Sequence, residues 1–121
     1  MSYCVVWVDH EHAKIFKFVP GDVQKSEVKK HGGHHGGHNT TEDKNHVHKM
    51  YQDVAHALQD STEILIVGNG VAKTEFKHFL ENHNEKKLVS KIVGVEAMDK
   101  ATDKEIELKA RHFFTKANLF N

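Results

Sequence analysis

The chain has 121 residues, which is enough for one domain with a single hydrophobic core and too few for two. Its 17 basic residues balance its 17 acidic residues, which excludes a global charge field that would attract nucleic acid or an anionic membrane. The single cysteine excludes an intramolecular disulfide and a cysteine-based zinc site, and it predicts a reducing, cytoplasmic location. We also expect no signal peptide and no membrane-spanning segment, because the apolar runs are short.

The first part of the chain has the pattern of an antiparallel meander. The run Tyr3–Val8 is β-branched and aromatic, which predicts a buried strand. The segment 13–19 alternates between polar and apolar residues and predicts a second strand, paired with the first as a hairpin. After the turn signal Pro20-Gly21-Asp22, the polar alternation over 23–30 predicts an edge strand.

A segment rich in glycine and histidine follows the third predicted strand. Eight of the 11 residues over 29–39 are Gly or His. Paired glycines weaken both helices and strands, because glycine loses more backbone entropy on folding than other residues. We therefore predict a flexible loop over 31–39 that has two lysines at its base.

The rest of the chain alternates between helical and extended patterns. Apolar residues recur at helical spacing from Val47 to Leu58, whereas the run 63–67 is apolar on both faces, as in a strand buried on both sides of a sheet. The sequence Thr102-Asp103-Lys104-Glu105 has the pattern of a capping box. The predicted elements are a helix beginning at Thr40 or Thr41, a strand over 63–67, a helix over about 71–83, a strand over 88–95 and a helix beginning near 102.

The predicted element order is β-β-β-α-β-α-β-α. A meander followed by αβ crossovers gives a mixed sheet with helices on its faces. This is the order of the ribonuclease H-like three-layer α/β fold, and we predict a single domain of this class over 1–121.

Nucleases of this fold need several carboxylates that hold two metal ions. Asp9 ends the first predicted strand, where the first such carboxylate would lie. The strand over 63–67, however, is followed by Gly68-Asn69 rather than by an acid, and nothing in the pattern supports Asp43 or Asp53 as partners. We therefore interpret Asp9 as a turn residue.

The segment 68–74 has some features of a phosphate-binding loop. A Walker loop needs glycine directly before its lysine, but Ala72 precedes Lys73. We predict a tight turn between strand and helix instead. The helix N-terminus and Lys73 could then contact an RNA phosphate.

The histidines of the predicted loop have the spacing of candidate metal ligands. Neutral imidazoles bind zinc and nickel, and the intervening glycines would let the chain wrap around an ion. The alternative prediction is therefore a zinc or nickel site. Two arguments speak against a metal site: structural zinc sites usually include cysteine, and ordering so flexible a loop would cost entropy. Our primary expectation is therefore that the protein has no cofactor. The candidate ligands are His31, His34, His35 and His38.

Two segments, taken with the element order, resemble one family. Residues 28–38 are similar to the Lys-Lys-His-Gly stretch and Gly-Gly-Gln loop in the middle domain of archaeal and eukaryotic class-1 peptide-chain release factors and their bacterial and Pelota-like relatives. Residues 64–76 are similar to the family's strand, small-residue turn and Lys-Thr-Glu helix start. The middle domain of this family has a ribonuclease H-like fold.

The resemblance implies a release- or rescue-type protein that associates with the ribosome or tRNA. Gly36, Gly37 and His38 match the motif that serves peptidyl-tRNA hydrolysis in release factors, but histidine replaces glutamine. Imidazole differs from a carboxamide in shape and titrates near neutrality, so we expect hydrolysis to be absent rather than present. Binding to RNA should be weak and dependent on salt, since the chain is neutral. The predicted phosphate contacts are Lys25, Lys29, Lys30 and Lys73.

Overall fold

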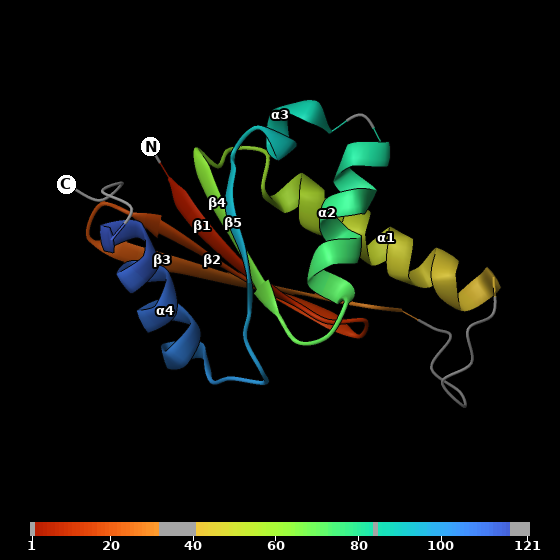
Figure 1. Ribbon diagram of the computed structural model, residues 1–121, viewed down its shortest axis with the longest axis horizontal. Helices are drawn as coiled ribbons and strands as arrows, with labels where there is room; N and C mark the ends of the chain where they lie inside the picture. Colours follow the sequence, from red (N-terminus) through yellow and green to blue (C-terminus); the bar gives the residue numbers. More distant parts are fainter. Residues whose placement is uncertain (1, 32–40, 84, 117–121) are drawn as a thin grey trace.

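The structure is a computed structural model that describes residues 2–31, 41–83 and 85–116, with the side chains of 41–43 left out. One five-stranded mixed sheet lies between two layers of helices (Figure 1). The elements are β1 (Tyr3–Val8), β2 (His12–Val19), β3 (Asp22–Lys29), α1 (Thr41–Ala57), β4 (Glu63–Gly68), α2 (Ala72–Asn82), α3 (Lys86–Val89), β5 (Ile92–Ala97) and α4 (Asp103–Lys116).

The strand order across the sheet is β3-β2-β1-β4-β5. The pairs β1–β2 and β2–β3 are antiparallel, as expected for a meander, whereas β1–β4 and β4–β5 are parallel and need crossover connections. Helix α1 lies in the crossover from β3 to β4, and α2 with α3 lies in the crossover from β4 to β5. The predicted three-layer α/β fold with a mixed sheet is confirmed.

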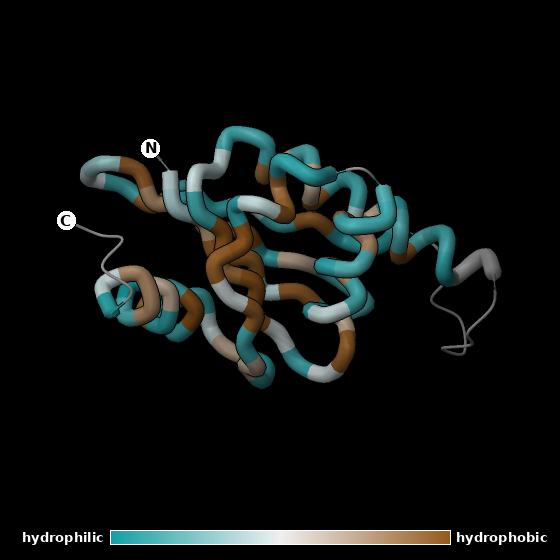
Figure 2. The backbone as a smooth tube through the Cα atoms, turned by 45° about the horizontal axis from the view of Figure 1, so that its top comes forward, coloured by the Kyte–Doolittle hydropathy of each residue, from teal (hydrophilic) through white to brown (hydrophobic). Residues whose placement is uncertain are grey.

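The alternation of side chains along the strands divides the core into two layers. Helices α1 and α2 cover one face of the sheet, and α4 covers the other (Figure 1). Ile64 and Ile66 of β4 belong to the core under α1 and α2, whereas Leu65 and Val67 belong to the core under α4. All four side chains are fully buried, which confirms the prediction that this strand is covered on both sides. The apolar colouring of Figure 2 is accordingly concentrated on the central strands.

The predicted strand over 88–95 was wrong at its beginning. Leu88 lies in the short helix α3, and β5 begins only at Ile92. Leu88 is fully buried in the core under α1 and α2. A short apolar run does not distinguish a buried helical turn from a strand, so the pattern was ambiguous at this point.

Strands β1 and β4 approach each other closely at their carboxyl ends. A Cβ atom placed on Gly68 would lie 2.3 Å from the backbone oxygen of Val8. The backbone nitrogen of Met98 donates a hydrogen bond of 2.8 Å to the Gly68 oxygen, which brings the end of β5 to the same place. Glycine is therefore required at 68 by the packing of the backbone. Among the described residues, no helix is both long and apolar enough to cross a membrane.

Candidate nucleic-acid interface

The segment rich in glycine and histidine connects the edge strand β3 to helix α1. Gly36, Gly37 and His38 lie outside the described residues, as do the candidate metal ligands His34 and His35. The hydrolysis motif and the metal site therefore both stay predictions. His31, the first of the four candidate ligands, is described and exposed.

Lys30 anchors the start of this segment to the turn between β1 and β2. Its backbone nitrogen donates a hydrogen bond of 2.8 Å to the Glu11 oxygen. Its side chain is only 4% exposed, and Nζ lies 3.6 Å from Oε1 of Glu11. The ammonium group of Lys30 thus holds the base of the segment against Glu11. The predicted phosphate contact of Lys30 stays a prediction.

The turn that holds Lys30 is itself well ordered by hydrogen bonds. Oδ1 of Asp9 accepts hydrogen bonds of 2.8 Å from the backbone nitrogens of both Glu11 and His12. This arrangement agrees with our interpretation of Asp9 as a turn residue. Within the described part of the chain, no three His, Cys, Asp or Glu side chains are grouped so that they could hold a metal ion.

Lys29 is the exposed lysine at the base of the segment. It lines a shallow pocket of about 430 Å³ at the end of the sheet. The other residues that line this pocket are Glu11, His12, Glu27 and Lys30. Two lysines and two glutamates face the pocket, so its formal charge is balanced when the histidine is neutral.

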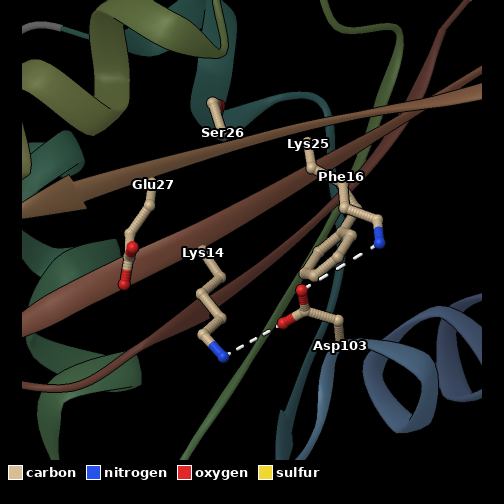
Figure 3. Close-up of a pocket in the computed structure, with 6 residues that line it drawn as sticks. All are labelled: Lys14, Phe16, Lys25, Ser26, Glu27 and Asp103. Atoms are coloured by element: carbon tan, nitrogen blue, oxygen red, sulfur yellow. Dashed lines mark hydrogen bonds and ion pairs between the residues drawn. The ribbon is translucent and has the colours of Figure 1, made fainter.

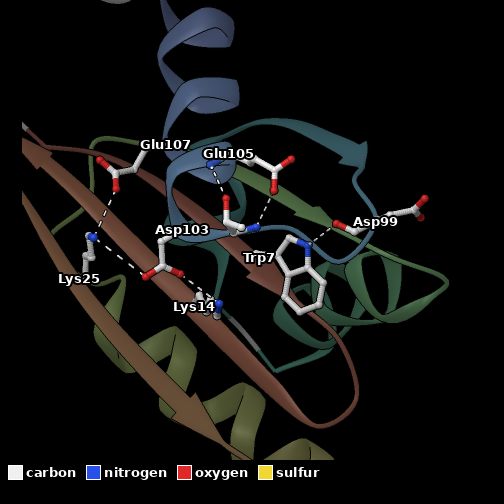
Figure 4. A network of polar contacts seen from close by, with 8 residues as sticks. Trp7, Lys14, Lys25, Asp99, Asp103, Glu105 and Glu107 are labelled. Atoms are coloured by element: carbon white, nitrogen blue, oxygen red, sulfur yellow. Dashed lines mark hydrogen bonds and ion pairs between the residues drawn. The ribbon is translucent and has the colours of Figure 1, made fainter.

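Lys25 belongs to an ion-pair network that links β3 to α4 (Figure 3). Its Nζ lies 3.5 Å from Oε2 of Glu107 and 4.0 Å from Oδ2 of Asp103. Lys14 of β2 donates a hydrogen bond of 3.0 Å to Oδ1 of the same aspartate. Figure 4 shows both lysines directed from the strands toward the first turn of α4. The Lys25 side chain is still 51% exposed, so its ammonium is paired but accessible.

Lys14 was missed by the sequence reasoning, although a signal for it was present. The antiparallel register places Phe16 opposite Lys25 and Lys14 opposite Glu27. Side chains two residues apart share a face, so Lys14 and Lys25 lie on the same side of the sheet. The alternation of β2 predicts this face, but the carboxylates of α4 that pair with the lysines come from a remote part of the sequence.

Lys73 is separated from the other predicted phosphate contacts. It lies in the first turn of α2, where its Nζ donates a hydrogen bond to the backbone oxygen of Gly70. Gly70 has a φ of +67°, so it forms the tight turn that we predicted between β4 and α2. The structure thus places Lys25, Lys29 and Lys30 on or just after β3, and Lys73 on a different element.

A further polar cluster, not found from the sequence, joins the β1–β2 turn to α1 and α2. Nε2 of His10 lies 2.7 Å from Oε1 of Glu75, and the Tyr51 hydroxyl donates to the same oxygen over 3.5 Å. Burial, and then the charge of Glu75, raise the pKa of Tyr51, so the phenol stays protonated and remains a donor. Glu75 of α2 therefore connects the β1–β2 turn, through His10, with α1, through Tyr51. The same turn anchors Lys30.

Comparisons with known proteins identify the fold. No protein-family model and no curated protein matches the sequence. Among solved structures, Pelota from Thermoplasma acidophilum has a TM-score of 0.63 at 19% identity over 96% of this chain, and Pelota from Archaeoglobus fulgidus has 0.68 at 15% over 95%. The archaeal translation termination factor aRF1 has 0.64 at 15% over 91%.

These matches cover only 32%, 32% and 34% of the respective proteins, so this chain spans about a third of their length. The identities are low, and the likeness therefore concerns the fold. It agrees with the resemblance noted in the sequence as far as the fold is concerned, while the Gly-Gly-His motif stays a prediction. The chain has the fold of one domain shared by Pelota proteins and an archaeal translation termination factor.

Proposed function

We propose that this protein is a translation factor-like protein of the release or rescue type, which acts in the cytoplasm and contacts ribosomal RNA or tRNA through the loop over 31–39. The observation that carries the proposal is the fold likeness to Pelota and aRF1 over more than 90% of the chain. It is supported by the Lys-Lys-His-Gly sequence at the end of β3, which resembles the approach to the functional loop of release factors.

The lysines at the base of the loop have different parts in this proposal. Lys29 is exposed and makes the direct phosphate contact. Lys30 holds the base of the loop against Glu11, and Lys25, half-exposed beside Glu107, adds a second and weaker contact. Because each of these cations has acidic neighbours, affinity for free RNA stays low and shape recognition at the ribosome supplies the specificity.

We assign no hydrolytic activity to the protein. In this proposal Gly36 and Gly37 leave the backbone free to present the N–H of His38 to an RNA or ester oxygen. The imidazole at this position differs in shape from the carboxamide of the release-factor motif. Peptidyl-tRNA ester hydrolysis is the reaction to assay once binding is established.

Co-sedimentation with ribosomes from a matching cell extract tests the proposal. The gradients are run at low and at physiological salt, with and without a chelator, so that a metal bound by the loop histidines is recognised. The variants are a deletion of 32–37 and Lys29→Ala, and the matched control is Lys104→Ala, which removes an exposed lysine of α4. We expect the wild type and the control to co-migrate with ribosomes at both salt concentrations.

The deletion should abolish co-migration at physiological salt, and Lys29→Ala should weaken it and reduce its dependence on salt. If the wild type stays at the top of both gradients, or if the deleted variant migrates as the wild type does, the proposal is wrong. The shared fold would then be present without the shared role.

A further inference from the structure

A second pocket lies between α1 and α2, on elements that the proposed function does not use. It has a volume of about 300 Å³, at the small end of the range of about 300–1,000 Å³ that is typical of small-molecule sites. The second half of α1 and the residues just after it form one side, and the end of α2 with the connection to α3 forms the other. The residues that line it are Gln52, Ala55, His56, Gln59, Phe79, His83 and Glu85.

An aromatic platform lies in this pocket. Phe79 is 5% exposed, and the exposed His83 ring stacks on it with a centroid distance of 4.1 Å and an interplanar angle of 22°. His48 of α1 packs edge-on against His83 at 6.1 Å and 69°. Residues of both α1 and α2 therefore support the platform. Its exposed ring, His83, lines the pocket and can stack against a further planar group.

The orientation of the platform is set by a hydrogen bond. Nδ1 of His83 lies 2.9 Å from the backbone oxygen of Phe79. A carbonyl oxygen only accepts hydrogen bonds, so Nδ1 carries the proton that it shares with this oxygen.

The rim of the pocket presents polar groups of several kinds. Gln52 and His56 are exposed and lie four residues apart, so they share one face of α1. Nε2 of Gln59 donates to the Ala55 oxygen over 3.3 Å and to Oε2 of Glu85 over 3.4 Å, which leaves the amide oxygen of Gln59 as an acceptor. Amides, an imidazole and a carboxylate together provide donors and acceptors that match the edges of nucleobases.

We propose that this pocket binds an unpaired nucleobase of single-stranded RNA. The base stacks on His83, and its edge is hydrogen-bonded by Gln52, His56 and Glu85. Lys86 and Lys87, which follow Glu85 and are exposed, contact the adjoining phosphates. The choice of RNA as the polymer rests on the proposed function, but the pocket is separate from the loop over 31–39.

The polar rim favours a nucleobase over an aromatic side chain of a protein. A phenyl or indole ring would use the platform but would leave most of the rim groups without partners, and polar groups that lose water without gaining a partner are costly. A base meets both requirements at once, since every base has an aromatic face and a polar edge.

Fluorescence anisotropy with the full chain and labelled RNA decamers tests the proposal. The probes are oligo(A), oligo(U) and an abasic decamer of the same charge, and unlabelled AMP serves as a competitor. The variants are His83→Ala, which removes the platform, and His83→Phe, which retains it. His78→Ala is the matched control, because it removes an exposed histidine of α2 that does not line the pocket.

We expect His83→Ala to raise the Kd for oligo(A) by about 5- to 150-fold, as is typical of the loss of one base–aromatic stack. His83→Phe should stay within about threefold of the wild type, and His78→Ala should not differ from it. The abasic decamer should bind much more weakly than oligo(A). Displacement of the decamer by AMP with the same dependence on His83 would support the pocket and identify free nucleotides as a second source of the base.

Equal binding of the abasic decamer, or equal affinities of His83→Ala and His78→Ala, would overturn the proposal. So would a tryptophan-containing peptide that displaces oligo(A) at concentrations where AMP does not, because it would indicate a protein partner. Nucleotide-induced NMR shifts of the Phe79 and His83 rings provide a readout that does not depend on variants.

The two proposals fail in different experiments. Loop-independent sedimentation together with decamer binding that depends on His83 would contradict only the proposed function. Loop-dependent sedimentation together with decamer binding that ignores His83 would contradict only this one.

Discussion

The two faces of the sheet are covered to different extents, and the difference decides where charged side chains lie. On one face, α1 and α2 bury a continuous apolar layer that includes Val54, Leu58 and Phe76. On the other face, α4 packs on the central strands, and an open pocket beside it is lined by Lys14 and Lys25. Most residues of the edge strand β3 are exposed. Where no helix covers the strands, Lys14 and Lys25 form ion pairs with carboxylates near the N-terminus of α4 in place of apolar packing.

The comparison separates the face that stabilises the fold from the surface that the proposed function uses. The two-helix face holds the larger of the two clusters of buried apolar residues, so substitutions there should reduce the free energy of unfolding strongly. The partly covered face carries surface ion pairs, which contribute little to stability. The edge strand β3, which contributes Lys25 to these ion pairs, leads directly into the segment over 31–39.

The largest effect is expected from Phe76→Ala on the two-helix face. The ring is fully buried and lies 5.4 Å from the ring of Tyr51, so its removal leaves a cavity. We expect the free energy of unfolding, measured with urea, to fall by about 3–5 kcal/mol. Leu108→Ala on α4, at a side chain that is 58% exposed, should change it by less than about 0.5 kcal/mol. If the loss for Phe76→Ala is as small as that for Leu108→Ala, the two-helix face is not closely packed.

Gly68→Ala tests the contact between the two central parallel strands. The added Cβ would lie 2.3 Å from the Val8 oxygen, and a backbone atom cannot move aside alone. We expect a loss at the upper end of the about 1–3 kcal/mol that is typical of overpacking. Gly70→Ala has open space around it and only a strained φ of +67°, so it should cost about 1 kcal/mol. Thermal unfolding measures both variants, and the midpoint of Gly68→Ala should be the lower one. A lower midpoint for Gly70→Ala would contradict the close approach of the strands.

Thr102→Ala tests the start of the helix that covers the other face. Oγ1 of Thr102 accepts a hydrogen bond of 3.2 Å from the Glu105 nitrogen, and the Thr102 nitrogen donates to Oε1 of Glu105 over 2.8 Å, which confirms the predicted capping box. The substitution should cost about 1 kcal/mol in urea unfolding. Thr74→Ala, at an exposed threonine of α2, is the control and should have little effect.

The capping box also predicts a pH dependence. The backbone hydrogen bond from Thr102, and then its side chain, lower the pKa of Glu105 below the usual value. A carboxyl with a lowered pKa in the folded state stabilises the fold above its unfolded pKa, and this contribution is lost as the pH falls through the folded pKa. In an NMR titration, Glu105 should titrate at higher pH in Thr102→Ala than in the wild type. An unchanged titration would show that the threonine side chain has no influence on this carboxyl.

Asp103→Asn should have the smallest effect on stability. The aspartate pairs with Lys14 at 3.0 Å and with Lys25 at 4.0 Å, but its side chain is 47% exposed (Figure 3). We expect a loss of about 0.2–1 kcal/mol, which high salt should reduce. A double-mutant cycle with Lys14→Met isolates the pair. A coupling well above about 1 kcal/mol, unaffected by salt, would mean that this face is more enclosed than the comparison assumes.

Most of the fold was predictable because its signals are local. Strand alternation, the turn at Pro20-Gly21-Asp22 and the capping box at Thr102 all depend on residues close together in the sequence. The short helix α3 was missed, since an apolar run such as that around Leu88 fits a buried strand equally well. The residues of the candidate site stay a prediction, and the acidic partners of its lysines could not be foreseen from the sequence.

The sequence by itself determined the element order apart from the short helix α3, the two-sided burial of β4 and the placement of the Gly/His segment between the edge strand and the first helix. Only the tertiary structure decided that Lys30 is held against Glu11, that Lys25 is paired with α4, and that His83 and Phe79 form a platform beside α1. The physical reason is the range of the interactions. Backbone propensity and side-chain periodicity act over a few residues, whereas charge pairing and ring stacking depend on segments that meet only once the sheet and its helices have packed.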